Sequence, residues 1–220
     1  KELEEQVDKH FSPNSFGYRP AKSAHQAIEQ ARINCWRYPW VIDVDIKGFF
    51  DNIDHELLLH AVSKFTDRKH ILLYVKRWLK APVQLKDGTL IQNIEKGTPQ
   101  GGVISPLLAN IYLHPLDKLA EKLGWRMTRY ADDFIIQCPT REEAETALRT
   151  IREWMEAAGL TLHPEKTRIV DATTRGGFDF LGWHFERGYK WPREKSLRRL
   201  RDCIREETCR SNGTSMETIV

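Results

Sequence analysis

The sequence predicts an α+β fold, in which a small sheet packs on helices, and three observations support this class. Residues 40–46 and 129–138 are short apolar runs with β-branched side chains, which are typical of buried strands. Residues 55–65 and 141–155 instead carry apolar residues at helical spacing. The order along the chain is strand, helix, strand, strand, helix, strand, so the two apolar runs can be neighbours in one sheet.

Length and composition indicate a globular chain without a membrane span. The chain has 220 residues, of which 40% are hydrophobic and 30% charged, and its net charge is +3. No apolar run approaches the roughly 18 residues that a spanning helix needs, and the charged start of the chain does not resemble a signal peptide. Four cysteines without C-x-x-C spacing indicate reduced thiols, so we expect a cytoplasmic protein.

The first forty residues predict two helices joined by a loop. Residues 1–11 have a helical spacing of apolar side chains, and residues 12–20 are rich in Pro, Asn and Gly. Ser23 is a suitable N-cap for the second helix. Arg19 and Lys22 come just before this helix N-terminus, which is a favourable place to bind a triphosphate. Surface solubility is the alternative explanation.

The strand at residues 40–46 alternates apolar and acidic residues. Because side chains in a strand alternate with a period of two, Asp43 and Asp45 are expected on one face. The segment 48–51 then leaves the strand.

The middle of the chain predicts a helix, a hairpin, a loop and a long helix. Residues 71–79 have helical periodicity, and residues 83–94 predict a hairpin around an Asp-Gly turn. Residues 97–102 form a glycine-rich stretch that either lets the backbone approach a ligand or builds a tight turn. Ser105 followed by Pro predicts the N-cap of a helix that runs to about Leu123.

The second apolar run begins with two adjacent carboxylates, Asp132 and Asp133. Placing them at the mouth of a buried strand costs desolvation free energy unless a positive charge is present. A divalent cation such as Mg²⁺ supplies that charge, and carboxylate oxygens are its preferred ligands. A hairpin turn is the alternative, because Asp is common in turns.

The last third of the chain predicts a helix, two strands and a basic helix. Thr140 begins a capping-box pattern for the helix that ends before Gly159. Residues 160–170 predict an extended segment, a turn containing Lys166, and a strand, and residues 177–186 predict one strand with an aromatic face. Residues 190–210 contain an excess of basic residues, which favours a surface facing phosphates over a merely solvated helix.

Carboxylates from two neighbouring strands suggest a specific chemistry. Such a pair can hold two Mg²⁺ ions about 3.5–4 Å apart and stabilise the attacking and leaving oxygens of an in-line phosphoryl transfer. This chemistry needs Asp rather than Lys, His or Cys, because Mg²⁺ prefers hard oxygen ligands.

Four sequence blocks in this order resemble the bacterial group II intron-encoded reverse transcriptases of the maturase type. They are residues 15–20 (SFGYRP) with 23–25 (SAH), 45–55 (DIKGFFDNIDH), 97–108 (GTPQGGVISPLL) and 130–133 (YADD). Residues 160–166 and 180–183 resemble the two blocks that follow in that family. The resemblance covers nearly the whole chain from Phe16 to Phe185.

The resemblance implies the fingers and palm of a right-hand polymerase, with an antiparallel palm sheet packed on helices. The implied division is residues 1–39 for part of the fingers, 40–54 and 105–188 for the palm, 55–104 for the connection between them, and 189–220 for the start of the thumb. The family normally has further fingers before Lys1 and a complete thumb and DNA-binding region after Val220. The zinc-type endonuclease module of some members is not seen here, and the chain lacks an initiator Met.

The resemblance also assigns roles to individual residues. Asp45 and Asp132 are implied metal ligands, Asp133 is the second acid of the motif, and the Ile46 carbonyl completes a metal shell. Asp43 is the competing candidate on the first strand. The implied nucleotide contacts are Arg19, Lys22, Gln100, Gly101 and Phe50, with Phe50 lying under the incoming sugar and Phe49 as its alternative. Lys166 either protonates the pyrophosphate leaving group or is an ordinary turn lysine, and residues 180–183 support the primer end.

The implied function is RNA-directed DNA polymerisation with two Mg²⁺ ions, which Mn²⁺ can replace, together with a maturase role in splicing and retrohoming. Its implied partners are an RNA template, a DNA or RNA primer, deoxynucleoside triphosphates and the intron RNA, without a membrane, and a homodimer is allowed. The alternatives are a retron, diversity-generating or CRISPR-associated reverse transcriptase, and a maturase that only binds RNA. An RNA-dependent RNA polymerase is disfavoured because Phe50 would occupy the space of a ribose 2′-hydroxyl.

Overall fold

The structure is a computed structural model that describes residues 2–84, 87–91, 95–98 and 102–208. Its helices are α1 Glu2–Asp8, α2 Ala24–Cys35, α3 Phe49–Asn52, α4 His55–Ser63, α5 Lys69–Leu79, α6 Ser105–Leu123, α7 Arg141–Ala157 and α8 Glu194–Glu207. Its strands are β1 Trp40–Val44, β2 Val83–Gln84, β3 Leu90–Ile91, β4 Arg126–Tyr130, β5 Asp133–Cys138, β6 Arg168–Asp171, β7 Phe178–Phe180, β8 Trp183–Glu186 and β9 Tyr189–Pro192. In the described part of the chain, none of the helices has the length and hydropathy needed to cross a bilayer.

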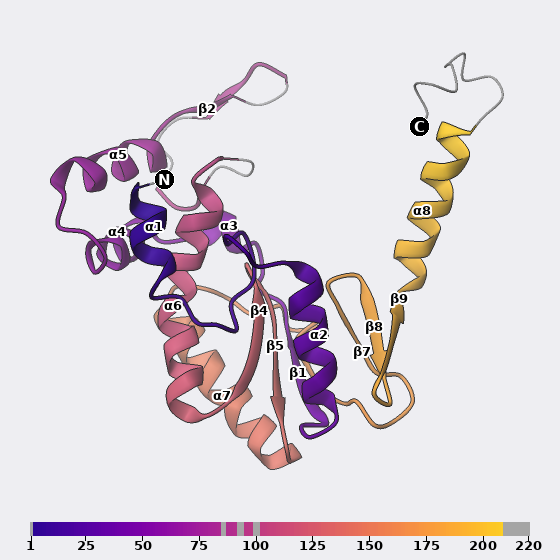
Figure 1. The fold of residues 1–220 in the computed structure, drawn as a ribbon. Helices are drawn as coiled ribbons and strands as arrows, with labels where there is room; N and C mark the ends of the chain where they lie inside the picture. Colours follow the sequence, from indigo (N-terminus) through magenta and orange to yellow (C-terminus); the bar gives the residue numbers. More distant parts are fainter. Residues whose placement is uncertain (1, 85–86, 92–94, 99–101, 209–220) are drawn as a thin grey trace.

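A four-stranded antiparallel sheet forms the centre of the molecule (Figure 1). The strand order is β4-β5-β1-β6, so the two strands that carry acidic residues are direct neighbours, as the sequence predicts. In the register between β1 and β5, Val44 lies opposite Phe134 and Asp43 opposite Ile135. Asp45, which directly follows β1, therefore lies at the same end of the sheet as Asp133, the first residue of β5.

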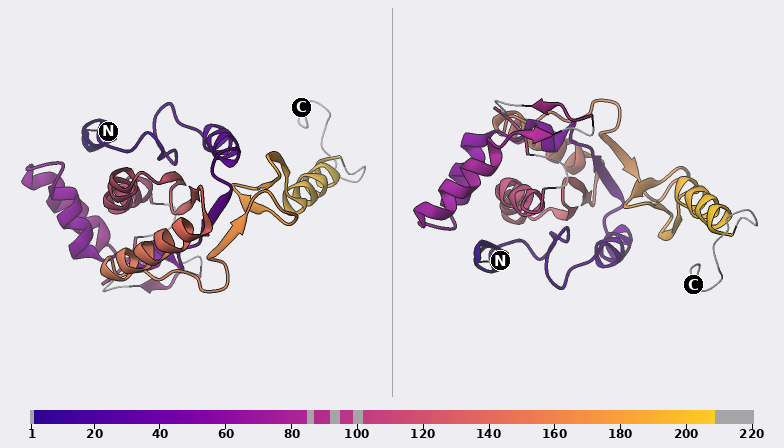
Figure 2. Two further views of the ribbon diagram at one scale, coloured as in Figure 1. Left: turned by 90° about the horizontal axis from the view of Figure 1, so that it is seen from below. Right: turned by 90° about the horizontal axis from the view of Figure 1, so that it is seen from above.

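The central sheet is covered by helices on both faces. α6 and α7 pack on one face and α2 on the other (Figures 1 and 2). Because strand side chains alternate, Phe134 and Ile136 enter the core beneath α6 and α7, whereas Ile135 enters the core beneath α2. Burial on both faces explains why the residues of β5 after Asp133 are almost continuously apolar.

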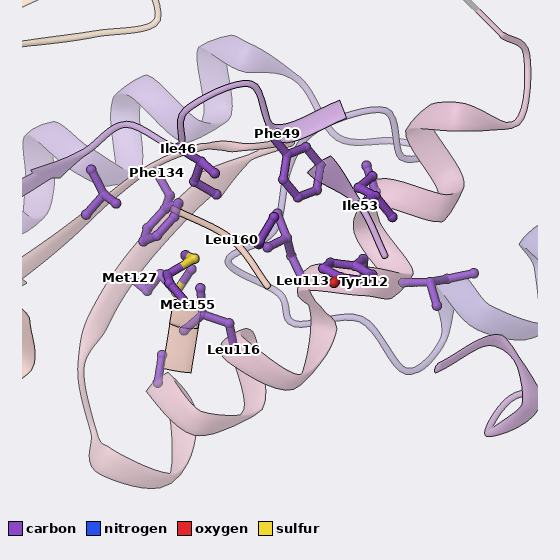
Figure 3. Packing of buried hydrophobic residues seen from close by; sticks show 14 of the residues in the cluster. Ile46, Phe49, Ile53, Tyr112, Leu113, Leu116, Met127, Phe134, Met155 and Leu160 are labelled. Carbon is purple, nitrogen blue, oxygen red and sulfur yellow. The ribbon is translucent and has the colours of Figure 1, made fainter. Parts of the chain in front are cut away.

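The larger core lies between the sheet, α6 and α7 (Figure 3). α7 is amphipathic and turns a stripe of side chains towards it: Ala144, Ala147, Ile151 and Met155, each at most 1% exposed. Phe49 packs in this core beside Tyr112, with ring centroids 6.3 Å apart. The site described below thus rests on a well-packed layer.

The prediction of a single strand at residues 177–186 is wrong. This segment is a hairpin of β7 and β8, and β9 adds a third strand. Leu181 and Gly182 both have positive φ angles, 48° and 80°, which reverse the chain after β7. The hairpin places Phe178 opposite Phe185, and their rings stack with centroids 4.9 Å apart.

The helix ends agree with two of three capping predictions. Ser23 forms a complete capping box with Gln26 at the start of α2, and the Thr140 side chain accepts a hydrogen bond from the backbone N–H of Glu143. The N-cap of α6 is Ile104 rather than Ser105, which is the first helical residue. The prediction placed this helix start one residue too late.

Candidate active site

The candidate active site lies where β1 ends and the β4–β5 hairpin turns. Asp45 follows β1, Asp133 opens β5, and Asp132 lies in the turn between β4 and β5, in which Tyr130 pairs with Asp133. The two carboxylates therefore lie at a hairpin turn, which is one of the two predicted explanations, and this turn lies at the same end of the sheet as Asp45. Antiparallel pairing of β1 with β5 brings together residues almost 90 positions apart in the sequence.

Burial raises the pKa of two carboxylates at this edge, Asp133 and Asp132, and neighbouring negative charges raise it further. Burial is the main cause of a pKa of about 7 for Asp133, and the charges of Asp43, Asp132 and Asp45 raise it further. Burial likewise raises the pKa of Asp132, with a contribution from Asp45. Several negative charges thus share this edge of the sheet, and a bound cation would stabilise their ionised forms.

Two basic side chains partly balance this charge. Lys166 Nζ lies 3.3 Å from Asp45 Oδ2, and Arg168 Nε lies 3.6 Å from Asp43 Oδ2. Burial still raises the pKa of Asp43 to about 6, against the opposing charge of Arg168. Both aspartates have a basic partner, but Asp45 follows Val44, which lies opposite Phe134, and so stands nearer the hairpin turn than Asp43, which lies opposite Ile135.

A cavity of about 420 Å³ opens beside these residues. Asp43, Asp45 and Asp133 line it together with Lys166, and so does Asp179 of β7. A larger cavity of about 890 Å³ lies between α1, α5 and the start of α6 and contains none of these carboxylates. We place the chemistry at the smaller cavity, because two carboxylates with a raised pKa, Asp43 and Asp133, lie there.

The donor set suits Mg²⁺. Among the residues that the structure describes, no group of three or more His, Cys, Asp or Glu side chains is placed so that it could hold a metal ion. Mg²⁺ does not require one, because it keeps several waters and binds through one or two carboxylates plus substrate phosphates. Asp45 and Asp132 supply such carboxylates, with Asp133 beside them, and the backbone of Ile46 follows Asp45 directly.

The two phenylalanines after β1 occupy different environments. Gly48 has a φ of 55°, and the chain then enters the single turn of α3 rather than continuing as a strand. Phe49 is 2% exposed in the core, whereas Phe50 is only half-buried. Phe50 is therefore the residue with a surface available to a ligand, because the turn of α3 directs the two adjacent side chains to different surroundings.

The start of the glycine-rich loop is held against α3 by backbone hydrogen bonds. The backbone N–H of Thr98 donates to the Phe50 carbonyl at 2.7 Å, and that of Gly97 donates to the Ile53 carbonyl at 2.7 Å. A Cβ on Gly97 would come within 2.8 Å of the Phe50 carbonyl oxygen, so glycine is required for this approach. The predicted contacts Gln100 and Gly101 lie outside the described residues.

The prediction that Arg19 contacts a triphosphate does not agree with the structure. Its side chain is only 8% exposed, and Nε pairs with Asp8 Oδ1 at 2.7 Å. Nη1 donates to the carbonyls of Ser12 and Ser15, so the guanidinium fixes the loop that precedes α2. Lys22 is half-buried, and its Nζ donates to the Pro13 carbonyl at 2.9 Å.

Asp179 and Arg193 line the cavity but were not among the predicted site residues. Asp179 accepts a hydrogen bond at Oδ1 from His184 Nδ1 at 2.7 Å, and its Oδ2 lies 3.8 Å from Arg193 Nη1. The sequence did contain a signal, the alternation Phe178, Asp179, Phe180. In a strand this pattern places the two aromatic side chains on one face and the acid on the other face.

Comparisons with known proteins indicate the family to which the chain belongs. The profile of the family described as "Reverse transcriptase (RNA-dependent DNA polymerase)" matches residues 1–185. The group II intron-encoded protein LtrA of Lactococcus lactis subsp. cremoris is 40% identical over 126 residues, which cover 57% of this chain and 20% of LtrA. Protein YkfC of Escherichia coli (strain K12) is 30% identical over 213 residues, covering 78% of this chain and 55% of YkfC.

A solved structure shows the same fold. Apo telomerase from Candida tropicalis superposes with a TM-score of 0.69 at 13% identity, over 94% of this chain and 41% of that one. This chain spans only a fifth of the length of LtrA. The relatives confirm the resemblance to group II intron-encoded reverse transcriptases, and the match over residues 1–185 shows the family. The chain therefore belongs to the reverse transcriptase (RNA-dependent DNA polymerase) family.

Proposed function

We propose that this chain carries the fingers and palm of a group II intron RNA-directed DNA polymerase, which extends a DNA or RNA primer on an RNA template. The observation that carries the proposal is the convergence of Asp45, Asp132 and Asp133 at one end of two neighbouring strands. A binding protein has no need to gather carboxylates whose pKa is raised by burial and by neighbouring negative charges.

The proposed site uses two Mg²⁺ ions, and Mn²⁺ is expected to replace them. Asp45, Asp132 and the Ile46 carbonyl would hold the ions, with Asp133 acting through water or by tuning the local charge. The bound ions would supply Lewis-acid stabilisation of the phosphates during nucleotidyl transfer.

The other residues at the site have separate proposed roles. Phe50 lies under the sugar of the deoxynucleoside triphosphate, and Lys22 contacts its phosphates. Gln100 and Gly101 contact the nucleotide and the template. Lys166, at 3.3 Å from Asp45, is positioned to donate a proton to the leaving pyrophosphate.

We propose the following division of the chain. Residues 1–39 belong to the fingers, 40–54 and 105–188 to the palm, and 189–220 to the start of the thumb, with 55–104 connecting fingers and palm. We also propose binding of intron RNA, with a maturase role in splicing and retrohoming; the similarity to LtrA, a group II intron-encoded protein, supports a link to such an intron. The free cysteines of the described chain, Cys35, Cys138 and Cys203, fit a cytoplasmic location.

Primer extension on an RNA template tests the proposal, with Asp132→Ala as the decisive variant. We expect wild-type extension in Mg²⁺, and loss of extension with retained RNA binding in the variant. Thermal stability is expected not to fall, because removing one carboxylate relieves repulsion at the site. More than a few per cent of wild-type extension by Asp132→Ala would refute the assignment, and RNA binding without extension by the wild type would favour the non-polymerising maturase.

A further inference from the structure

Arg129 lies in β4, three residues before the candidate metal ligand Asp132, and its side chain is completely buried. Nε donates to Asp117 Oδ1 at 2.7 Å and Nη2 to Asp117 Oδ2 at 2.5 Å, which makes a bidentate pair. Nη1 donates to Asn110 Oδ1 at 2.9 Å and to the Ala131 carbonyl at 2.8 Å. The guanidinium thus connects α6 to the turn that carries the two aspartates.

Asp117 and Asn110 are both buried residues of α6. They are seven residues apart, about two helical turns, so their side chains leave the same face of the helix. Asp117 is 3% exposed, and burying a complete ion pair costs substantial desolvation free energy. Two hydrophobic side chains of similar volume would pack here without this desolvation free energy. A contribution to folding stability is therefore a weak explanation for the ion pair of Arg129 with Asp117.

The Arg129 side chain also contacts the β4–β5 turn, which carries Asp132. Ala131 has a φ of 59°, in the left-handed region that residues other than glycine rarely adopt. The hydrogen bond from Arg129 Nη1 holds the carbonyl of this residue, and the next residue is Asp132. The positive charge of Arg129 also opposes the rise in the pKa of Asp132.

The same network reaches the loop before α2. Asn110 Nδ2 donates to the Gly17 carbonyl at 2.8 Å, and the backbone of Arg129 pairs with Asn14 and Phe16 at 3.0 and 2.8 Å. A Cβ on Gly17 would lie 2.3 Å from the Ala131 nitrogen, so this loop touches the turn directly. A displacement of the loop would therefore also move the backbone at Ala131 and the adjacent Asp132.

We propose that Arg129, held by Asp117 and Asn110, is a positioning residue that orients the Asp132 carboxylate for metal binding and couples it to the loop at residues 14–17. This inference rests on the proposed function, because it needs Asp132 to be a metal ligand. Substitution of groups that orient a metal ligand typically lowers metal affinity or activity by about 10–100-fold.

The first test is Arg129→Lys, which keeps the charge and loses the bidentate geometry. We expect Mn²⁺ binding, measured by electron paramagnetic resonance without nucleotide, to weaken by about tenfold. In primer extension on an RNA template, the Mg²⁺ concentration for half-maximal rate should rise by a similar factor, while KM for the deoxynucleotide stays within about twofold. A merely structural role would lower the melting temperature without this selective change.

Gln137→Met is the matched control. Gln137 is also buried in the central sheet, and its Nε2 donates to the Ala31 carbonyl at 3.0 Å, at the end of β5 away from the turn. We expect this variant to lose thermal stability with unchanged Mn²⁺ binding and Mg²⁺ requirement. The same weakening of Mn²⁺ binding in Gln137→Met would overturn the proposal, because any disturbance of the sheet would then suffice.

Asn110→Leu decides the question if Arg129→Lys does not fold. This variant keeps the ion pair of Arg129 with Asp117 and removes the bonds from Asn110 to Arg129 and Gly17. We expect several-fold weaker Mn²⁺ binding, and wild-type binding by the folded variant would overturn the proposal.

If the wild type binds Mn²⁺ but extends no primer, the proposed function fails, and weaker Mn²⁺ binding by the variants still supports the positioning role. Absence of Mn²⁺ binding by the folded wild type would refute both.

Discussion

Phe49 and Phe50 show how adjacent identical side chains take different roles at the scale of single residues. Phe49 is 2% exposed and belongs to the core beneath the sheet, whereas Phe50 is half-buried beside the attachment point of the glycine-rich loop. Their rings meet edge to face with centroids 5.2 Å apart. One side chain therefore supports the other, and only Phe50 has a surface left for a substrate.

Substitution of each phenylalanine by alanine separates these roles. Phe50→Ala should raise ribonucleotide incorporation strongly and lower deoxynucleotide use less, because it opens space for a 2′-hydroxyl. Phe49→Ala should destabilise the protein by roughly 3–5 kcal/mol without altering sugar choice. Single-nucleotide incorporation and chemical denaturation measure the two effects. Relaxed sugar choice in Phe49→Ala alone would move the sugar contact by one residue.

The raised pKa of Asp133 leads us to expect that the stability of the fold depends on pH and on Mg²⁺. Burial and the neighbouring carboxylates raise this pKa from 3.8 to about 7, so between these pH values Asp133 holds more protons in the folded protein than in the unfolded chain. Stability without metal should therefore fall as the pH rises from 4 to 7. Mg²⁺ should raise the melting temperature at pH 8 and have little effect at pH 5, where protons compete for the carboxylates.

Thermal melts over this pH range, with and without Mg²⁺, check the prediction. Asp133→Asn is the control, because it cannot ionise and should flatten the pH dependence in the absence of metal. A melting temperature that rises from pH 4 to 7 in metal-free wild type would contradict the shifted pKa.

The candidate site residues differ in how far the sequence could predict them. Asp45, Asp132 and Asp133 were predictable, because strand patterns and adjacent acids are local signals. Arg19 was not, because its partner Asp8 lies eleven residues earlier and meets it only when the loop folds back on α1. A charge beside a helix N-terminus indicates anion binding only while that charge is free, and local sequence does not show this.

At the scale of elements, the site depends on how loops attach to helices and strands. The start of the glycine-rich loop is held on α3 by two backbone hydrogen bonds, and the loop before α2 is held on β4. The helices and the central strands were predictable from periodicity. The β7–β8 hairpin was not, because the positive φ of Leu181 comes from tertiary context and its sequence offers only one glycine as a turn signal.

Two glycines test the attachment of the glycine-rich loop. Gly97 and Gly88 have similar φ angles, 83° and 87°, but a Cβ on Gly88 would meet nothing within 4 Å, whereas one on Gly97 would meet backbone oxygens. Gly88→Ala should cost about 1 kcal/mol from backbone strain alone. Gly97→Ala should cost more and should raise KM for the deoxynucleotide.

Denaturation and steady-state extension distinguish these two variants. The difference between them isolates the contact with the Phe50 and Asp51 carbonyls from the cost of a positive φ angle. Equal losses of stability in both variants, with an unchanged KM, would show that the close approach to α3 is unimportant.

At the scale of the whole molecule, α8 stands apart from the body that carries the site. It projects at the end opposite α5 (Figures 1 and 2), and none of its residues is buried. Arg198 and Arg199 are exposed on this helix. The excess of basic residues along a projecting helix favours contact with a phosphate backbone.

Replacing Arg198 and Arg199 together by glutamine should weaken RNA binding and reduce the slope of log K against log salt concentration by about two. Binding to labelled template-primer at several salt concentrations measures this slope. Arg152→Gln on the exposed side of α7 is the control and should leave the slope unchanged. An unchanged slope in the double variant would exclude α8 from the phosphate-binding surface.

The pairing of β1 with β5 also has a consequence for synthesis of the protein on the ribosome. Val44 and its partner Phe134 are 90 residues apart, so at about 5–20 residues per second the first strand emerges roughly 5–20 s before its neighbour. During this interval the apolar side chains of β1 lack their sheet partner, and a chaperone or an early collapse with α2 must shield them. Asp45 meets Asp132 and Asp133 only after the β4–β5 hairpin has been synthesised. The nascent chain therefore cannot bind metal at the proposed site before residues 130–133 (YADD) are made.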